Sequence, residues 1–320
     1  MRKRAKVTVA VAVAAVLAGA GVGIGAVAGG GGGSSMPPGA VSSGVDPLTG
    51  LPGKPGSVLA VKIDNVAAAR PAVGLTQADI VYVERVESGL SRLMAVYGGT
   101  DKPAVVGPVR SARETDLQVL SAYGRPAFAY SGAVSGFLPV LKHAAVVNLS
   151  PAQKAGAYFR SNDRAAPHNL FVRTAGLTTG ATTAKGIGLR FGALPHGGRP
   201  AAAVRANLPA ASFRFTWNDA ASAYTVVMDG RDTAAARPEN VIVQHVKVTD
   251  SPGGFFDTNG GGKVSEPFSR TVGSGTATVL RDGKEFTVTW NRPAPTDGTT
   301  YTYQGKPFTL HPGQTWIVLD

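Results

Sequence analysis

Residues 104–123 read AVVGPVRSARETDLQVLSAY, and this stretch indicates the fold class. It opens with a nearly continuous apolar run, Ala104–Val109, of the kind found in strands that are covered on both faces. In the run Glu114–Tyr123, two leucines and a tyrosine recur three residues apart, which is close enough to the helical period to form one apolar stripe. A strand, a short turn and a helix in this order predict a layered α/β arrangement.

Similar runs lie on both sides of this stretch. We expect a helix at Val134–His143 and further strands at Val58–Ile63, Ile80–Val83, Leu93–Tyr97, Pro126–Tyr130 and Ala145–Leu149. Strands that alternate with helices predict an α/β N-terminal domain with a layered mixed sheet over residues 57–180.

Residues 209–320 follow a different pattern and predict a mostly antiparallel β C-terminal domain. Asp229-Gly230 and Asp282-Gly283 are strong hairpin signals, because both central residues of a type I′ turn need a positive φ. The expected strands are Phe213–Trp217, Tyr224–Met228, Val241–Val248, Thr276–Leu280, Glu285–Trp290, Tyr301–Tyr303 and Trp316–Leu319. Residues 181–208, with clusters of Thr, Gly, Ala and Pro, are predicted to be a linker or surface loops.

The N-terminus has the pattern of an export segment. Four basic residues lie within positions 2–6, and the following 22 residues, Val7–Ala28, carry no charge. Either a signal peptide or a signal anchor fits residues 1–28: Ala26-Val27-Ala28 favours cleavage, while the length of the run favours retention in the membrane. Residues 29–56, rich in Gly, Ser and Pro, predict a flexible tether. We therefore expect an extracytoplasmic protein, either anchored by its N-terminal helix or secreted.

Composition excludes several classes of function. The chain has no cysteine, so disulfides, thiolate metal sites and cysteine nucleophiles are impossible. The histidines show no metal-binding spacing and there is no phosphate-binding loop or G-x-S-x-G motif, so we expect neither a metal nor a cofactor. Beyond the export segment, 28 basic residues face 20 acidic ones, which favours loose attraction to envelope anions or simply serves solubility. No Lys/Arg-rich run follows that segment, so nucleic acid is not an expected partner.

The segment Gly107–Glu114 concentrates polar groups at a strand end. Ser111 and Glu114 have the spacing of a capping box, which predicts that Ser111 caps the helix. Arg110 and Arg113 would then lie beside a helix N-terminus, where free amides and the helix dipole favour an anion. The arginines either bind a carboxylate or phosphate or pair with nearby carboxylates.

Other polar residues are expected to reach the same place. In an open α/β sheet ligands bind beyond the carboxyl ends of the strands. His168 has the chemistry of a general acid or base, although a lone histidine in a loop is more often a hydrogen-bonding residue. A structural ion-pair network among Asp64, Glu84, Arg70 and Arg110 is the alternative. The candidate ligand-binding residues are Asp64, Asn65, Arg70, Glu84, Arg92, Arg110, Ser111, Arg113, His168 and Asn169.

The chain resembles the YerB-like family of lipoproteins of Gram-positive bacteria, which have N- and C-terminal domains of unknown function. The motifs that carry the resemblance include Asp46–Pro52 (DPLTGLP), Gly107–Arg113 (GPVRSAR), Ala166–Leu170 (APHNL) and Pro312–Ile317 (PGQTWI). The resemblance implies an extracytoplasmic, membrane-associated protein and brings no catalytic residues with it. Family members typed as lipoproteins carry a lipobox cysteine, and this chain has none, so Val7–Ala28 is its candidate for membrane attachment.

Two functions fit these observations. The first is envelope-associated binding of an anionic ligand or of a cell-wall or envelope partner through an Arg-containing site. The alternative is a hydrolase or transferase that acts on a cell-wall glycan, with Glu84 or Asp64 as acid or base together with His168. The sequence does not say whether the chain is an enzyme, and its catalytic residues are unknown.

Overall fold

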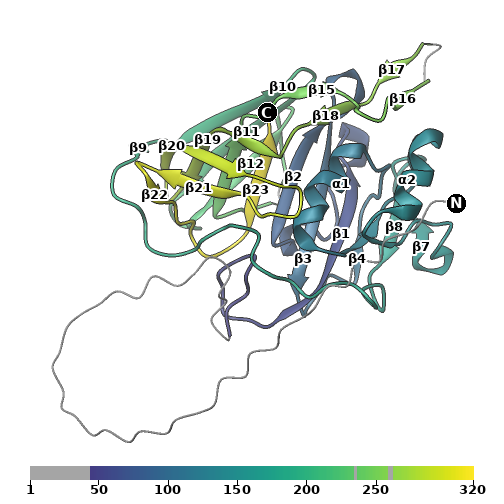
Figure 1. Cartoon of the computed structure of the whole chain (residues 1–320), viewed down its shortest axis with the longest axis horizontal. Helices are drawn as coiled ribbons and strands as arrows, with labels where there is room; N and C mark the ends of the chain where they lie inside the picture. Colours follow the sequence, from purple (N-terminus) through teal and green to yellow (C-terminus); the bar gives the residue numbers. More distant parts are fainter. Residues whose placement is uncertain (1–43, 234–235, 259–261) are drawn as a thin grey trace, which may run out of the picture. The chain divides into compact units, whose positions relative to one another are not determined.

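A mixed sheet of twelve strands dominates the computed structural model, which describes residues 44–233, 236–258 and 262–320 (Figure 1). Strand β9 (Arg199–Pro200) pairs with β20 at one side. The other strands follow in the order β22 (Lys306–Pro307), β21 (Thr300–Tyr303), β20 (Lys284–Arg292), β19 (Gly273–Arg281), β14 (Asn240–Gln244), β23 (Thr315–Leu319), β2 (Ile80–Arg85), β3 (Ser91–Gly99), β1 (Pro55–Asp64), β5 (Ala127–Ala129) and β6 (Val147–Asn148).

The last strand of the chain joins the two parts of the sheet. Strand β23 lies between β14 and β2 and is parallel to both, and its Trp316 is fully buried. The described residues accordingly group into one compact unit. The predicted domain boundaries near residues 180 and 209 stay predictions, although strands from either side share this sheet.

The directions of the strands confirm the predicted fold class. In the N-terminal part β1 pairs antiparallel with β3 but parallel with β5, and β5 is parallel to β6, which makes this part a mixed sheet. In the C-terminal part β14, β19, β20 and β21 pair antiparallel in sequence. A separate antiparallel sheet follows the order β10 (Ala203–Leu208), β11 (Ala211–Asn218), β12 (Ala223–Met228) and β13 (Arg231–Asp232).

Different layers cover the two faces of the main sheet, because successive side chains of a strand point to opposite faces. In β1, Val58 and Ala60 belong to the core beneath the helices α1 (Glu114–Leu120) and α2 (Leu138–His143). Leu59 and Val61 point to the other core, which is covered by the β10–β13 sheet. Helices on one face and a second sheet on the other leave little of the central strands exposed (Figure 1).

Several predicted elements are shorter in the structure. The run Ala104–Val109 forms only the two-residue strand β4 (Val105–Val106), because Gly107 has a φ of 156° and Pro108 lacks the N–H needed to continue a ladder. A side chain at Gly107 would also collide with Phe171. The helix expected at Glu114–Tyr123 ends at Leu120 and continues as a 3₁₀ turn, and the helix expected at Val134–His143 begins with a 3₁₀ turn.

Short strand pairs and 3₁₀ helices make up the rest of the regular secondary structure in the described residues. Strand β4 pairs with β8 (Leu170–Arg173), which pairs with β7 (Tyr158–Arg160). Two further pairs are β15 (Val248–Asp250) with β18 (Pro267–Ser269) and β16 (Phe256–Asp257) with β17 (Val264–Ser265). The 3₁₀ helices are Ala67–Ala69, Leu75–Gln77, Glu87–Gly89, Ser121–Tyr123, Ser135–Phe137 and Ala155–Ala157.

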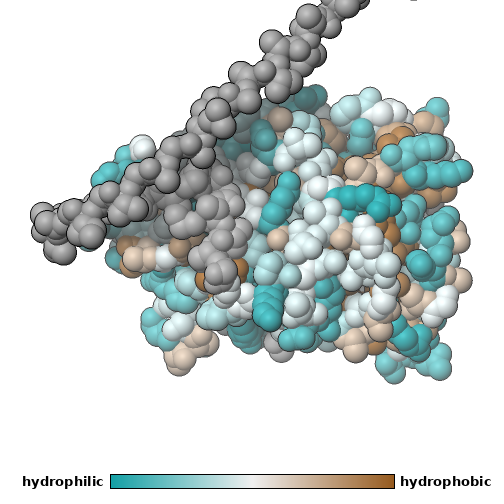
Figure 2. All heavy atoms as spheres, turned by 60° about the horizontal axis from the view of Figure 1, so that its bottom comes forward, coloured by the Kyte–Doolittle hydropathy of each residue, from teal (hydrophilic) through white to brown (hydrophobic). Residues whose placement is uncertain are grey.

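The predicted export segment, residues 1–28, lies outside the described residues. From residue 44 onward the predicted tether is described, and there Leu48 is fully buried. No helix in the described ranges is long and apolar enough to span a membrane. Most residues on the face shown in Figure 2 are hydrophilic or neutral, and the hydrophobic ones occur in limited patches.

Candidate functional site

The carboxyl end of β1 meets the segment that follows β4, and this contact positions the candidate residues. The backbone N–H of Asp64 donates to the carbonyl of Pro108 at 2.9 Å, and the N–H of Arg110 donates to the carbonyl of Lys62 at 2.8 Å. These two bonds hold the side chains of Asp64 and Arg110 beside each other.

Asp64, Arg110 and His168 form a compact group that we call the Asp64 cluster. The Oδ2 atom of Asp64 lies 2.8 Å from Nδ1 of His168 and 3.4 Å from Nε of Arg110. The side chain of Asp64 is 3% exposed, whereas those of His168 and Arg110 are 23% and 27% exposed. One buried carboxylate therefore holds two partly exposed nitrogen-bearing side chains.

The outer atoms of the Asp64 cluster are available to a ligand. With an ionised Asp64 the Nδ1 atom of His168 is the donor, so Nε2 faces other partners as acceptor, or as donor once the ring is protonated. Among the described residues neither Nε2 of His168 nor the Nη atoms of Arg110 have a hydrogen-bond partner. The cluster can thus offer a guanidinium edge and an imidazole nitrogen to the same ligand.

Arg70 and Asn65 connect neighbouring loops. Arg70 donates from Nε to Oδ1 of Asn65 at 3.2 Å, and its Nη2 pairs with Oδ2 of Asp229 at 2.6 Å. Asn65 in turn donates to the hydroxyl of Ser91 at 2.9 Å. Because these groups satisfy one another, both residues have structural roles, and Arg70 ties β1 to the turn after β12.

Asn169 stabilises the loop that carries His168. Its side chain donates to the carbonyl of Ser161 at 2.9 Å and accepts from Nη1 of Arg160 at 2.6 Å. Arg164 fastens the same loop by donating to the backbone carbonyls of Ala69 and, at 2.7 Å, Pro71. The position of His168 therefore rests on contacts from several surrounding groups.

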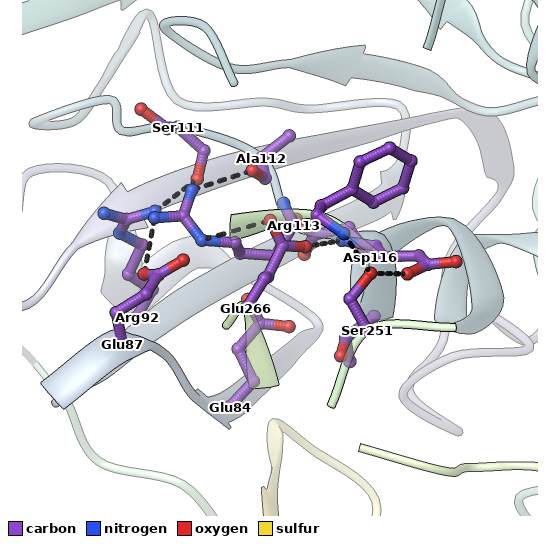
Figure 3. A network of polar contacts seen from close by, with 12 residues as sticks. Glu84, Glu87, Arg92, Ser111, Ala112, Arg113, Asp116, Ser251 and Glu266 are labelled. Carbon is purple, nitrogen blue, oxygen red and sulfur yellow. Dashed lines mark hydrogen bonds and ion pairs between the residues drawn. The ribbon is translucent and has the colours of Figure 1, made fainter. Parts of the chain in front are cut away.

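Arg113 lies in a buried network and is not available to a ligand (Figure 3). Its Nη2 pairs with Oε2 of Glu87 at 2.6 Å, and its Nε lies 3.7 Å from Oε2 of Glu266. A carboxylate oxygen of Glu266 also accepts from the backbone N–H of Glu114, the first residue of α1. An internal carboxylate therefore occupies this helix N-terminus, and for Arg113 the structure agrees with the second predicted alternative, pairing with nearby carboxylates.

The predicted cap of this helix is wrong. The N-cap residue is Arg113 and not Ser111, and the N–H of Arg113 donates to Oδ2 of Asp116 at 2.7 Å. Ser111 precedes the helix, where its carbonyl accepts from Nη1 of Arg92 at 2.9 Å. Burial, with the like charge of Arg113 next in importance, lowers the pKa of Arg92 to about 10.

Glu84 belongs to the same buried region but faces a residue that we did not predict as part of the site. Lys62 of β1 is fully buried; its Nζ contacts Oε1 of Glu84 and donates to Oδ1 of Asp116 at 2.8 Å. Burial, followed by the nearby charge of Asp116, raises the pKa of Glu84. A lysine inside an otherwise apolar strand was the available signal, because a buried ammonium requires carboxylate partners.

The structure thus divides the predicted residues into two groups. Asp64, Arg110 and His168 meet, with Asn65, Arg70 and Asn169 supporting the loops around them. Glu84, Arg92, Ser111 and Arg113 lie in or beside the buried network (Figure 3). The predicted ion-pair network holds for Asp64 with Arg110, whereas Glu84 pairs with Lys62 and Arg70 with Asp229. The described residues contain no group of three or more potential metal ligands.

Comparisons with known proteins agree with this architecture. A protein of Bacillus subtilis (strain 168) described as "Putative lipoprotein YerB" is 32% identical over 114 residues, which cover 35% of this chain and 34% of the relative. The crystal structure of YerB protein from Bacillus subtilis superposes with a TM-score of 0.70 at 23% identity, covering 86% of this chain and 95% of that one.

The family comparison covers both parts of the chain. Residues 48–187 match the N-terminal domain, and residues 204–317 the C-terminal domain, of the family described as protein of unknown function (DUF3048). The sequence resemblance to YerB-like proteins is thereby confirmed, and the chain belongs to the DUF3048 family.

Proposed function

We propose that the chain is an extracytoplasmic, cell-envelope-associated protein that binds an anionic ligand at the Asp64 cluster. The observation that carries this proposal is the shared attachment of Arg110 and His168 to one buried carboxylate, with their outer nitrogens unpartnered in the described part of the chain. A guanidinium edge can take two oxygens of a carboxylate or phosphate at once. Cell-wall polymers supply both kinds of oxygen, so a wall component is the proposed partner.

The charge of the cluster favours an anion over a neutral ligand. Asp64 compensates Arg110 when His168 is neutral, and protonation of His168 adds one positive charge. The cluster therefore carries no net negative charge that would oppose an anionic ligand.

Binding to carboxylate-bearing peptidoglycan fragments tests the proposal. We expect the full chain with Arg110→Gln to bind them at least about tenfold more weakly than the unmodified chain, since a bidentate charged contact is lost. Arg190→Gln is the matched control, because Arg190 is an exposed arginine that lies outside the cluster. Equal weakening by both variants would show general electrostatic attraction and would refute the site.

Envelope association is proposed to depend on residues 7–28 as an uncleaved membrane anchor. The relative's name describes a lipoprotein, and this chain has no cysteine to which a lipid could be attached. The intact mass of the protein recovered from the membrane fraction tests the anchor. A mass that corresponds to cleavage after Ala28 would instead support a secreted protein.

A hydrolase or transferase acting on a cell-wall glycan is the second candidate. It is favoured by the 2.8 Å contact between His168 and Asp64, in which a carboxylate orients an imidazole as in many general bases. Glu84 would not serve as the partner acid, because it is 2% exposed and pairs with Lys62. Mass spectrometry of glycan fragments incubated with the full chain tests this candidate: products lost on His168→Gln would support catalysis, and unchanged fragments would refute it.

A further inference from the structure

The β10–β13 sheet has one face turned to solvent, and that face carries two positive charges at directly opposite positions of neighbouring strands. Phe213 and Phe215 of β11 are buried against the main sheet, where Phe215 contacts Trp316 with ring centroids 6.3 Å apart. Side chains alternate along a strand, so Arg214 between them points the other way and is exposed. Arg205 of β10 lies directly opposite Arg214 in the antiparallel register and is exposed too.

These two arginines line a hollow of about 490 Å³ on the sheet. Asn207, Ser212 and Thr216 contribute polar side chains to it, and no acidic side chain lines it. Within the described residues the side chains of Arg205, Arg214 and Asn207 have no hydrogen-bond partner. The hollow is therefore rich in donors that nothing in the described protein satisfies.

Two acidic residues at strands β12 and β13 of this sheet pair with other groups. Asp229 accepts from the backbone N–H of Ser212 at 2.7 Å through Oδ1 and pairs with Arg70 at 2.6 Å through Oδ2. Asp232, at the far strand of the sheet, lies 3.9 Å from Arg237. Val227 separates Asp232 from Arg214 in the sheet, and neither aspartate forms an ion pair with Arg205 or Arg214 within the described residues. Like charges directly opposite each other on two strands repel and destabilise the pairing, so an external anion between them would relieve a cost that is built into the fold.

We propose that this surface, the Arg205–Arg214 face, binds the phosphodiester groups of an anionic envelope polymer. Two adjacent guanidinium groups match phosphate oxygens in geometry and charge. Both arginines are exposed, and exposed charges bind a single ion weakly, so a polymer that makes several contacts is the fitting occupant. A bilayer fits less well, because none of the exposed large hydrophobic side chains in the described residues lies on this sheet.

Binding of the full chain to poly(glycerol phosphate) tests the proposal. The double variant Arg205→Gln/Arg214→Gln should bind at least about tenfold more weakly than the unmodified chain. The control Arg190→Gln/Lys306→Gln removes the same charge from exposed positions outside the hollow and should change the affinity less than about twofold. Equal weakening by the two double variants would overturn the proposal.

Thermal unfolding gives a second readout that keeps the test valid if affinity changes are small. A ligand that binds the folded state raises the melting temperature, so the polymer should stabilise the unmodified chain more than the double variant. The double variant should itself melt no lower than the unmodified chain, because it loses a repulsion. Equal stabilisation of the two chains by the polymer would contradict the proposal.

Three further measurements test the geometry of this face and distinguish it from the Asp64 cluster and from a lipid-binding surface. Arg214→Lys keeps the charge but loses the planar fork, and it should give an intermediate affinity. In an Arg110→Gln background the Arg205→Gln/Arg214→Gln change should weaken polymer binding by the same factor as in the unmodified chain, so that this face and the Asp64 cluster can fail independently. Anionic lipid vesicles form the last arm: vesicle binding that depends on Arg205 and Arg214 while polymer binding does not would overturn the proposal.

Discussion

The Nδ1 atom of His168 lies 2.8 Å from Oδ2 of Asp64, although 104 positions separate the two residues in the chain. Asp64 ends a central strand of the main sheet, whereas His168 belongs to a loop fastened by Arg164 to the segment after β1. A rigid strand therefore positions one partner, and a docked loop brings the other to it. This contact is the structural basis for treating the Asp64 cluster as a site.

Replacing Asp64 with Asn should remove the orientation of His168 while leaving the fold intact. An asparagine carries no negative charge to compensate Arg110, and it does not fix Nδ1 of His168 as the donor. We expect ligand binding at the cluster to fall by about tenfold and the free energy of unfolding to fall by about 1 kcal/mol. ¹⁵N NMR of the imidazole should show protonated Nδ1 in the unmodified chain and a mixture of tautomers in the variant.

Asp163→Asn is the matched control for this experiment. Asp163 lies in the same loop, is exposed, and pairs with the hydroxyl of Ser161 and not with His168. The imidazole spectrum of this control should equal that of the unmodified chain. An unchanged spectrum in Asp64→Asn as well would contradict the proposed role of Asp64.

Replacing Lys62 with Met should strongly destabilise the fold. Lys62 is the shared partner of the buried carboxylates Glu84 and Asp116, and its removal leaves both without their ammonium. Breaking a buried ion pair in this way costs about 3–5 kcal/mol. Urea denaturation measures the loss, with Lys154→Met at an exposed position as the control.

A rescue variant separates charge imbalance from lost packing. In Lys62→Met/Glu84→Gln/Asp116→Asn neutral amides replace both carboxylates, so most of the lost stability should return. A triple variant no more stable than Lys62→Met would show that packing around the lysine stem, and not the buried charge, causes the loss.

Apolar periodicity predicts most of the strands but not the polar contacts. Runs such as Ile80–Val83 and Trp316–Leu319 reappear as β2 and β23, because burial of alternating or continuous apolar side chains is a local property of the sequence. The pairing of β2 with β23 joins residues more than 230 positions apart, and no local pattern encodes it.

The contacts of the buried network also cannot be predicted from local sequence patterns. Glu266 caps the N–H of Glu114 from 152 positions away, and Lys62 reaches Asp116 from 54 positions away. The sequence indicated that Arg113 would find an anion, yet whether that anion is internal depends on where the segment before β18 folds. His168 and Asp64 were both candidates, whereas their direct contact follows only from the docking of the loop.

Replacing Trp316 with Ala should test the junction between the two parts of the sheet. Trp316 is fully buried in β23, which pairs with β14 on one side and β2 on the other. Truncation of a large buried aromatic side chain costs about 3–5 kcal/mol. Trp217→Ala, at a half-buried tryptophan of β11, is the control and should cost less than half as much.

The shared strand also predicts how the Trp316→Ala variant unfolds. Far-ultraviolet circular dichroism and the fluorescence of the remaining tryptophans should report one coincident transition, because both parts of the sheet lose the same strand. Two separate transitions would indicate that residues on either side of the junction fold independently.

Glu266 should make the stability of the protein depend on pH. Burial raises the pKa of this carboxyl to about 7 from its usual 4.5, opposed first by the hydrogen bond from the backbone N–H of Glu114 and then by the charge of Arg113. The folded state thus holds the proton more tightly than the unfolded chain, so the contribution is fully present below about pH 4.5 and is lost as pH rises through about 7. Between pH 4.5 and pH 7 the free energy of unfolding should therefore fall less in Glu266→Gln than in the unmodified chain, by about 2 kcal/mol. Glu84, whose pKa is also raised, should cause much of the fall that the variant still shows. Urea denaturation across this pH range measures the difference, and Glu285→Gln is the control. If the free energy of unfolding of Glu266→Gln depends on pH as steeply as that of the unmodified chain, Glu266 does not cause the pH dependence.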